Sequence, residues 1–176
     1  MNFARVLETV SGFLAEKGYQ HALIGGVALA AYGFARTTLD LDFVLDAEAQ
    51  EDVVGFLASR GYETTHRTSG YSSHVHPDPL WGRVDILYVR GETSREIFAS
   101  CRASRGPGGL AVLLPKPEHL AAMKTLAMKN DPGRTFQEMA DIRFLLQLPG
   151  VDRQEVKRYF DRHGLKERFD ELEKDY

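Results

Sequence analysis

Three aspartates on two predicted strands are the residues of this sequence whose types and spacing favour chemistry. Asp40 and Asp42 stand two apart in a run of period two, so both side chains point to the same face of a strand predicted over 39–46. Two carboxylates about 7 Å apart on one strand face repel each other. A divalent cation offsets this repulsion. The alternative is that one aspartate pairs with Arg36 and the other is solvated.

A third acid, Asp85, lies in a second predicted strand, 83–89, at a position where an apolar residue is expected. If the two strands lie side by side, Asp85 joins Asp40 and Asp42 in one cluster. Three carboxylates arranged in this way can hold two metal ions. The alternative is that Asp85 lies on an exposed strand face.

A glycine pair, Gly25 and Gly26, stands between an apolar strand, 21–24, and the start of a helix. Two glycines let the backbone approach a ligand closely and leave N–H groups free at the helix N-terminus, where phosphate oxygens bind. A tight turn that binds no ligand is the alternative.

The elements that must position these residues mix strands and helices up to about residue 115, after which the pattern is almost entirely helical. The fold class predicted is α+β, with a small mixed β-sheet and flanking helices in residues 1–115, followed by a helical C-terminal region, 116–176, packed on that core. In the strand 39–46, the odd-numbered residues from Leu39 to Leu45 are expected to form the buried face. The other predicted elements are a helix from Phe3 to Gly18, helices at 27–32, 47–60 and 93–101, strands at 62–66, 71–76 and 110–114, and helices at about 117–130, 133–147, 151–162 and 164–173.

Composition excludes several classes of protein. The chain has 176 residues, of which 43% are hydrophobic and 27% charged, an ordinary globular balance. The single cysteine excludes an internal disulfide and a Cys-rich zinc site. No apolar run approaches the roughly 18 residues of a membrane span, and no signal peptide follows Met1, so a cytoplasmic protein without membrane contact is expected. The net charge of −3 gives no indication of a nucleic-acid partner.

The order of these features resembles the DNA-polymerase-β-like nucleotidyltransferase superfamily, which carries a Gly-Gly or Gly-Ser turn, an Asp-x-Asp strand and a later acid on an adjacent strand. The resemblance covers about residues 20–90. The sequences Leu-Ile-Gly-Gly-Val-Ala at 23–28 and Arg-Thr-Thr-Leu-Asp-Leu-Asp-Phe at 36–43 look like the small stand-alone members, including the AbiEii-type toxins of abortive-infection systems. A helical Lys124 followed by a helix that runs from Arg134 to Asp141 is also similar to AbiEii-like proteins.

The resemblance implies an enzyme that moves a nucleoside monophosphate from a nucleoside triphosphate to an acceptor hydroxyl, with Mg²⁺ or Mn²⁺ as cofactor. Asp40 and Asp42 would hold the metal on the triphosphate, and Asp85 would complete a second metal site and accept the proton of the attacking hydroxyl. The residues implied on the nucleotide side are Gly25, Gly26, Arg36, Thr38 and Lys124, with Asp141 and Lys116 as further candidates.

The same resemblance favours tRNA or a protein as the acceptor, with a small molecule as a further choice, and a toxin-like role with an antitoxin or other partner protein. Two other functions stay open. One is a non-catalytic nucleotide-binding or partner-binding module on the same fold. The other is an Asp-based phosphatase in which Asp40 is the nucleophile.

Two further groups of residues are assigned ordinary roles. His74 and His76 share a strand face, but no third or fourth zinc ligand stands at suitable spacing, so edge-strand histidines near a substrate cleft are predicted instead. In the C-terminal helices basic residues alternate with acidic ones, which predicts a solvated face rather than an RNA-binding surface.

Overall fold

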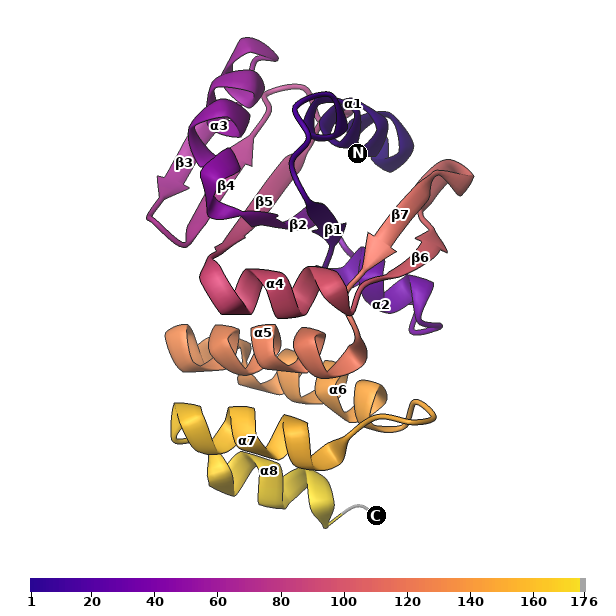
Figure 1. Cartoon of the computed structure of the whole chain (residues 1–176), viewed down its shortest axis with the longest axis vertical. Coiled ribbons are helices and arrows are strands. Elements are labelled where there is room, and N and C mark those ends of the chain that lie inside the picture. Colours follow the sequence, from indigo (N-terminus) through magenta and orange to yellow (C-terminus); the bar gives the residue numbers. More distant parts are fainter. Residues whose placement is uncertain (175–176) are drawn as a thin grey trace. The chain divides into compact units, whose positions relative to one another are not determined.

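The computed structural model describes residues 1–174, which form two compact units, residues 1–115 and a second unit that begins at Lys116 (Figure 1). The first unit holds a five-stranded mixed sheet with flanking helices and the second is helical, which confirms the predicted fold class. Every helix within residues 1–174 is too short or too polar to span a membrane. The elements are α1 (Phe3–Glu16), β1 (His21–Leu23), α2 (Gly25–Ala31), β2 (Asp40–Asp46), η1 (Ala47–Ala49), α3 (Gln50–Ser59), β3 (Glu63–Arg67), β4 (Tyr71–Val75), β5 (Arg83–Val89), α4 (Gly91–Ala99), β6 (Arg102–Arg105), η2 (Pro107–Gly109), β7 (Ala111–Leu114), α5 (Pro117–Asn130), η3 (Pro132–Arg134), α6 (Thr135–Leu146), α7 (Arg153–His163) and α8 (Lys166–Glu173).

The main sheet has the strand order β1-β2-β5-β4-β3. β2 and β5 are parallel, and the other neighbouring pairs are antiparallel. A separate two-stranded sheet is formed by β6 and β7. The sequence pattern did not predict β6, because Arg102–Arg105 is short and polar and has no apolar alternation, and most of it is exposed.

One face of the main sheet is apolar and the other carries the acids. The odd-numbered residues of β2 lie opposite the even-numbered residues of β5, so these two sets share a face. On that face Leu41, Phe43 and Leu45 are fully buried. Gln50, the first residue of α3, lies close enough to Tyr88 on this face to influence its pKa. The even-numbered residues of β2, including its aspartates, therefore point to the opposite face.

The burial predicted for the strand 39–46 is wrong at two residues, Leu39 and Val44. Leu39 is 79% exposed, because the strand and its pairing begin only at Asp40. Val44 is fully buried although it lies on the acid face. There α4 covers the end of the strand, and the Ser94 hydroxyl donates to Asp46 Oδ2 at 2.6 Å. A central strand covered on both sides loses the period-two pattern of a half-exposed strand.

His74 is a core residue and not the edge-strand histidine that was predicted. β4 lies between β3 and β5, and His74 is fully buried. Its Nδ1 lies 3.0 Å from Thr64 Oγ1 and its Nε2 2.8 Å from Ser72 Oγ. Each hydroxyl can donate or accept, so both ring nitrogens of a neutral imidazole are satisfied. Burial lowers the pKa of His74 to about 4.

We expect this histidine to make the protein less stable as the pH falls. The unfolded chain takes up a proton near the ordinary pKa of 6.5, while the folded chain does so only near 4. His74 therefore contributes its full stability above pH 6.5 and loses it between pH 6.5 and 4, a change of about 3 kcal/mol. Urea midpoints at pH 7, 5.5 and 4.5 measure this, and His74→Gln should give a flatter profile. Parallel profiles for the two proteins would contradict it.

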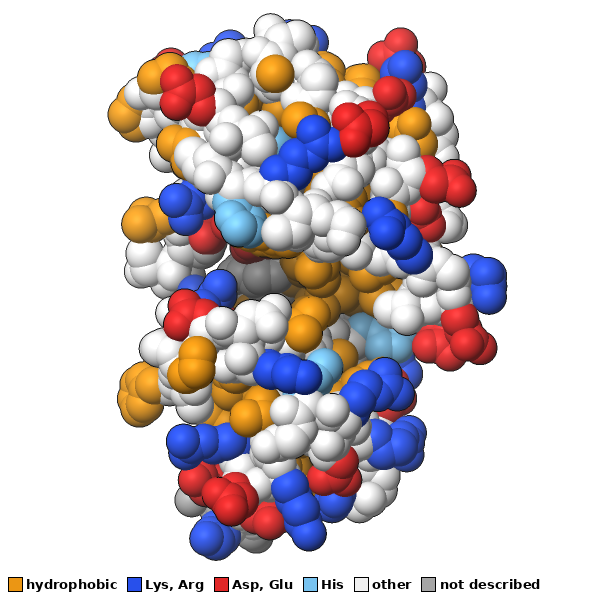
Figure 2. All heavy atoms as spheres, turned by 90° about the vertical axis from the view of Figure 1, so that its left-hand side faces the viewer, with side chains coloured by type: hydrophobic (Ala, Val, Ile, Leu, Met, Phe, Trp, Pro, Cys, Tyr) orange, Lys and Arg blue, Asp and Glu red, His pale blue; other side chains and the backbone are white. Residues whose placement is uncertain are grey.

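The second unit is a group of four helices, α5 to α8, with its own apolar core. Phe160 of α7 and Phe169 of α8 pack with ring centroids 5.4 Å apart. In the lower part of Figure 2, basic and acidic side chains are interspersed over these helices. Lys157 and Asp161, one helical turn apart, form one such ion pair at 2.8 Å. This mixture of charges is what a solvated face requires.

Candidate active site

The three predicted aspartates converge on the acid face of the sheet. Asp42 of β2 lies directly opposite Asp85 of β5 in the parallel pairing, and Asp40 lies two residues earlier on the same face. One carboxylate oxygen of each aspartate lies within 4.8 Å of the corresponding oxygens of the other two. Among residues 1–174 this is the one group of three or more side chains placed to hold a metal ion, and it contains no histidine.

Asp85 is the acid whose surroundings are most unusual. Its side chain is 8% exposed. Burial raises its pKa and the charge of Asp40 adds to this rise, while hydrogen bonds from Ser73 and Tyr71 and the charge of Arg83 oppose it. Its Oδ1 atom is buried and has no hydrogen-bond partner. A buried carboxylate oxygen without a partner, beside two more carboxylates, fits a divalent cation such as Mg²⁺ or Mn²⁺.

The glycine pair lies directly against this acid cluster. Gly25 has a φ of +62°, and a Cβ atom at this residue would stand 1.9 Å from Asp42 Oδ2. A Cβ atom at Gly26 would stand 2.7 Å from Thr38 Oγ1. Side chains at these two positions would therefore displace Asp42 and Thr38. Glycine is required at both positions because the side chains of Asp42 and Thr38 lie so close to the backbone there. The sequence pattern could not distinguish this requirement from that of a tight turn.

Thr38 and Arg36 lie on the segment that leads into β2. The Thr38 hydroxyl donates to Asp40 Oδ1 at 2.6 Å and so holds that carboxylate in place. Arg36 donates from Nη1 to the Thr37 carbonyl at 3.2 Å. Both side chains are thus tied to the backbone or to the acid cluster at the start of the strand.

A pocket of about 380 Å³ brings three of the predicted nucleotide-binding residues together. Gly26, Arg36 and Thr38 line it, and Arg105 at the end of β6 adds a second guanidinium group. Sequence reasoning missed Arg105, because it stands far along the chain beside a Gly/Pro loop and no spacing links it to the glycine pair. The other lining residues are Phe3, Val27, Ala30, Ala31, Gly106 and Pro107.

The remaining candidates lie in the second unit. The Lys124 ammonium is 2.9 Å from Glu138 Oε2 and 2.5 Å from Asp141 Oδ2. All three side chains are buried. Lys116 is 2.6 Å from Glu155 Oε2. These contacts join helices within the second unit, and a role for Lys124, Asp141 or Lys116 toward a nucleotide stays a prediction.

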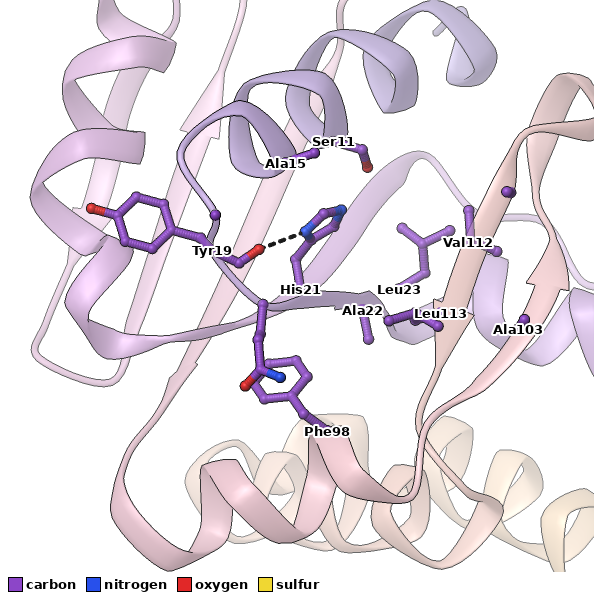
Figure 3. A pocket seen from close by; sticks show the side chains of 13 residues that line it. Ser11, Ala15, Tyr19, His21, Ala22, Leu23, Phe98, Ala103, Val112 and Leu113 are labelled. Carbon is purple, nitrogen blue, oxygen red and sulfur yellow. Dashed lines mark hydrogen bonds between the residues drawn. The ribbon is translucent and has the colours of Figure 1, made fainter.

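A second pocket, of about 460 Å³, lies between α1, β1 and β7 (Figure 3). Figure 3 shows His21 turned toward α1, and its Nδ1 lies 3.0 Å from the Tyr19 carbonyl, to which it donates. Phe98 lies on the other side of β1. None of the predicted site residues lines this pocket.

The fold is similar to that of several solved structures. The antibiotic-resistance factor ANT(2'')-Ia superposes with a TM-score of 0.68 at 15% identity, covering 99% of this chain and 98% of that one. Its complex with adenylyl-2''-tobramycin gives 0.67 at 13%, covering 93% and 98%. The lincomycin-bound lincosamide adenylyltransferase LnuA gives 0.58 at 15%, covering 81% and 96%. The fold is that of the nucleotidyltransferases.

Sequence comparison adds nothing to this. No family model matches the chain, and no curated protein matches it. At identities this low the shared property is the fold. The predicted fold is confirmed, and both membership of the superfamily and the likeness to AbiEii-type toxins stay predictions.

Proposed function

We propose that this protein is a metal-dependent nucleotidyltransferase. An acceptor hydroxyl attacks the α-phosphorus of a nucleoside triphosphate, and a new O–P bond forms. The bond from the α-phosphorus to the bridging oxygen breaks, pyrophosphate leaves, and the hydroxyl proton passes to a carboxylate. The observation that carries this proposal is the convergence of Asp40, Asp42 and Asp85, with one oxygen of each inside 4.8 Å.

The three aspartates have separate roles in this proposal. Asp40 and Asp42 would hold Mg²⁺ or Mn²⁺, and Thr38 orients Asp40 for that role. When bound, the metal neutralises charge that develops on the phosphate oxygens. Asp85 would be the third carboxylate facing the cation and would accept the acceptor's proton. The raised pKa of Asp85 supports this role, because a general base works best when its pKa approaches the working pH.

The pocket beside the cluster fits the triphosphate. It begins at Gly26 and Thr38, which adjoin the aspartates, and it carries the guanidinium groups of Arg36 and Arg105. Guanidinium groups bind phosphate oxygens in a fixed fork geometry. The glycine pair lets Asp42 and Thr38 lie close to the backbone beside this pocket. We therefore assign the nucleotide phosphates to this side of the cluster.

The acceptor proposed first is a small molecule with a free hydroxyl. ANT(2'')-Ia has been described with adenylyl-2''-tobramycin and LnuA with lincomycin, and this chain spans nearly the full length of both. The resemblance of the sequence to AbiEii-type toxins supports tRNA or a protein instead. A toxin-like role with an antitoxin partner belongs to that second choice, so the test must offer all three classes of acceptor.

The test is transfer of label from each α-labelled nucleoside triphosphate in the presence of Mg²⁺. The acceptors are an aminoglycoside, a lincosamide, total tRNA and candidate proteins. We expect labelled product with one class and its loss in Asp42→Asn. Glu63→Gln, a matched change on the exposed strand β3, should keep the activity.

Two outcomes of this test would contradict transfer. Triphosphate binding without labelled product would indicate a non-catalytic module. Release of inorganic phosphate through an aspartyl-phosphate at Asp40 would indicate a phosphatase.

A further inference from the structure

The strand β4 brings two hydroxyl groups against Asp85. Ser73 lies directly opposite Asp85 in the antiparallel β4–β5 pairing, so their side chains share the acid face of the sheet. Tyr71 lies two residues earlier on β4 and thus on the same face. Both side chains are close enough to the Asp85 carboxylate to influence its pKa. Tyr71 is also close enough to Asp42 to interact with its charge.

One oxygen of Asp85, Oδ1, is buried and has no hydrogen-bond partner, although the hydroxyl-bearing side chains of Ser73 and Tyr71 lie beside the carboxylate on the same face. Ser73 is 5% exposed, so water does not compete for this contact. Neutral hydroxyl groups beside the carboxylate restrict its rotation and leave its charge intact. A bidentate arginine would instead occupy both oxygens and offset that charge.

We propose that Ser73 and Tyr71 are positioning residues for Asp85, whose hydroxyls restrict rotation of its carboxylate and thereby keep it directed at the site that would hold the cation. This inference rests on the proposed function, because it assigns the third carboxylate to that site. Groups that orient a metal ligand in this way typically change metal affinity or activity by about 10–100-fold when they are removed.

The opposite face of the same strands supplies matched controls. Ser72 is as buried as Ser73, and its hydroxyl lies 2.8 Å from His74 Nε2 and 2.8 Å from the Tyr88 hydroxyl. Ser72→Ala removes a buried hydroxyl next to Ser73 in sequence, and Tyr88→Phe removes a buried phenol on β5. Both changes leave the acid face untouched, because adjacent residues of a strand point to opposite faces.

The experiment measures the affinity of the full-length protein for Mn²⁺ without nucleotide, from the electron paramagnetic resonance signal of the free ion. We expect Ser73→Ala and Tyr71→Phe each to weaken Mn²⁺ binding by about 10–100-fold and to lower transfer. Ser72→Ala and Tyr88→Phe should lower the melting temperature and keep the wild-type Mn²⁺ affinity.

The outcomes separate this inference from the proposed function. If the wild type binds Mn²⁺ and transfers nucleotide, and Ser73→Ala and Tyr71→Phe do the same, the positioning pair is overturned and the function stands. If the four variants all lose affinity in proportion to lost stability, the role is structural and the inference is overturned. A wild type that neither binds Mn²⁺ nor transfers nucleotide overturns both.

Discussion

Asp85→Asn is expected to lower nucleotide transfer by about 10²–10⁴-fold, the usual contribution of a general base, while it raises the melting temperature. The activity falls because the amide accepts no proton and offers a weaker ligand to the cation. Stability rises because burial and the charge of Asp40 make the ionised carboxylate unfavourable in the folded protein. Removing that charge relieves both costs, and the amide oxygen still accepts hydrogen bonds from Ser73 and Tyr71.

Thermal melting with and without Mg²⁺ checks this prediction. Mg²⁺ should raise the melting temperature of the wild type, because a ligand that binds the folded state stabilises it. The rise should be much smaller in Asp85→Asn. Glu63→Gln on the exposed strand β3 is the control, and it should change neither the activity nor the response to Mg²⁺. A variant Asp85→Asn that melts below the wild type would contradict the account of this carboxylate.

Lys124→Met is expected to destabilise the protein by about 3–5 kcal/mol, because it leaves buried carboxylates without their cation. Glu138 and Asp141 are each 1% exposed, and the Lys124 ammonium contacts both. Arg134 adds an ion pair to Glu138 Oε1 at 2.6 Å that is not aligned as a hydrogen bond. It therefore replaces only part of what Lys124 supplies.

Urea denaturation measures this loss, with Lys129→Met as the matched change on the same helix. Lys129 is exposed, so its removal should alter stability by less than about 0.5 kcal/mol. Equal midpoints for the two variants would show that the buried ion pairs contribute nothing. Nucleotide affinity, measured on the folded variants, separately tests the predicted role of Lys124. A loss in Lys124→Met beyond that in Lys129→Met would support it.

Local patterns determined much of the fold. Apolar residues at helical spacing predicted α1, and the proline and glycine breaks after Asn130 and Leu148 separated the C-terminal helices close to their observed bounds. Such patterns are readable because side-chain direction within one element follows from its period. Where a segment lacked this contrast, as in the polar strand β6, the prediction failed.

In the candidate site, the sequence pattern predicted one feature and could not predict another. Period two alone placed Asp40 and Asp42 on one face, because side chains of a strand alternate. It could not show that β5 pairs with β2 in the register that sets Asp42 opposite Asp85, since β3 and β4 intervene in the sequence. Register between distant strands depends on which faces the whole sheet buries, and no local pattern contains that information.

Tertiary structure also decided what several residues contact. It set Gly25 against Asp42, placed Arg105 in one pocket with Arg36, and buried Lys124 between two carboxylates. Each arrangement joins residues from different elements of the fold. The sequence by itself determined the residue types and the face that each element presents. Packing determined which faces meet, because burial of apolar surface and pairing of buried charge are properties of the assembled core.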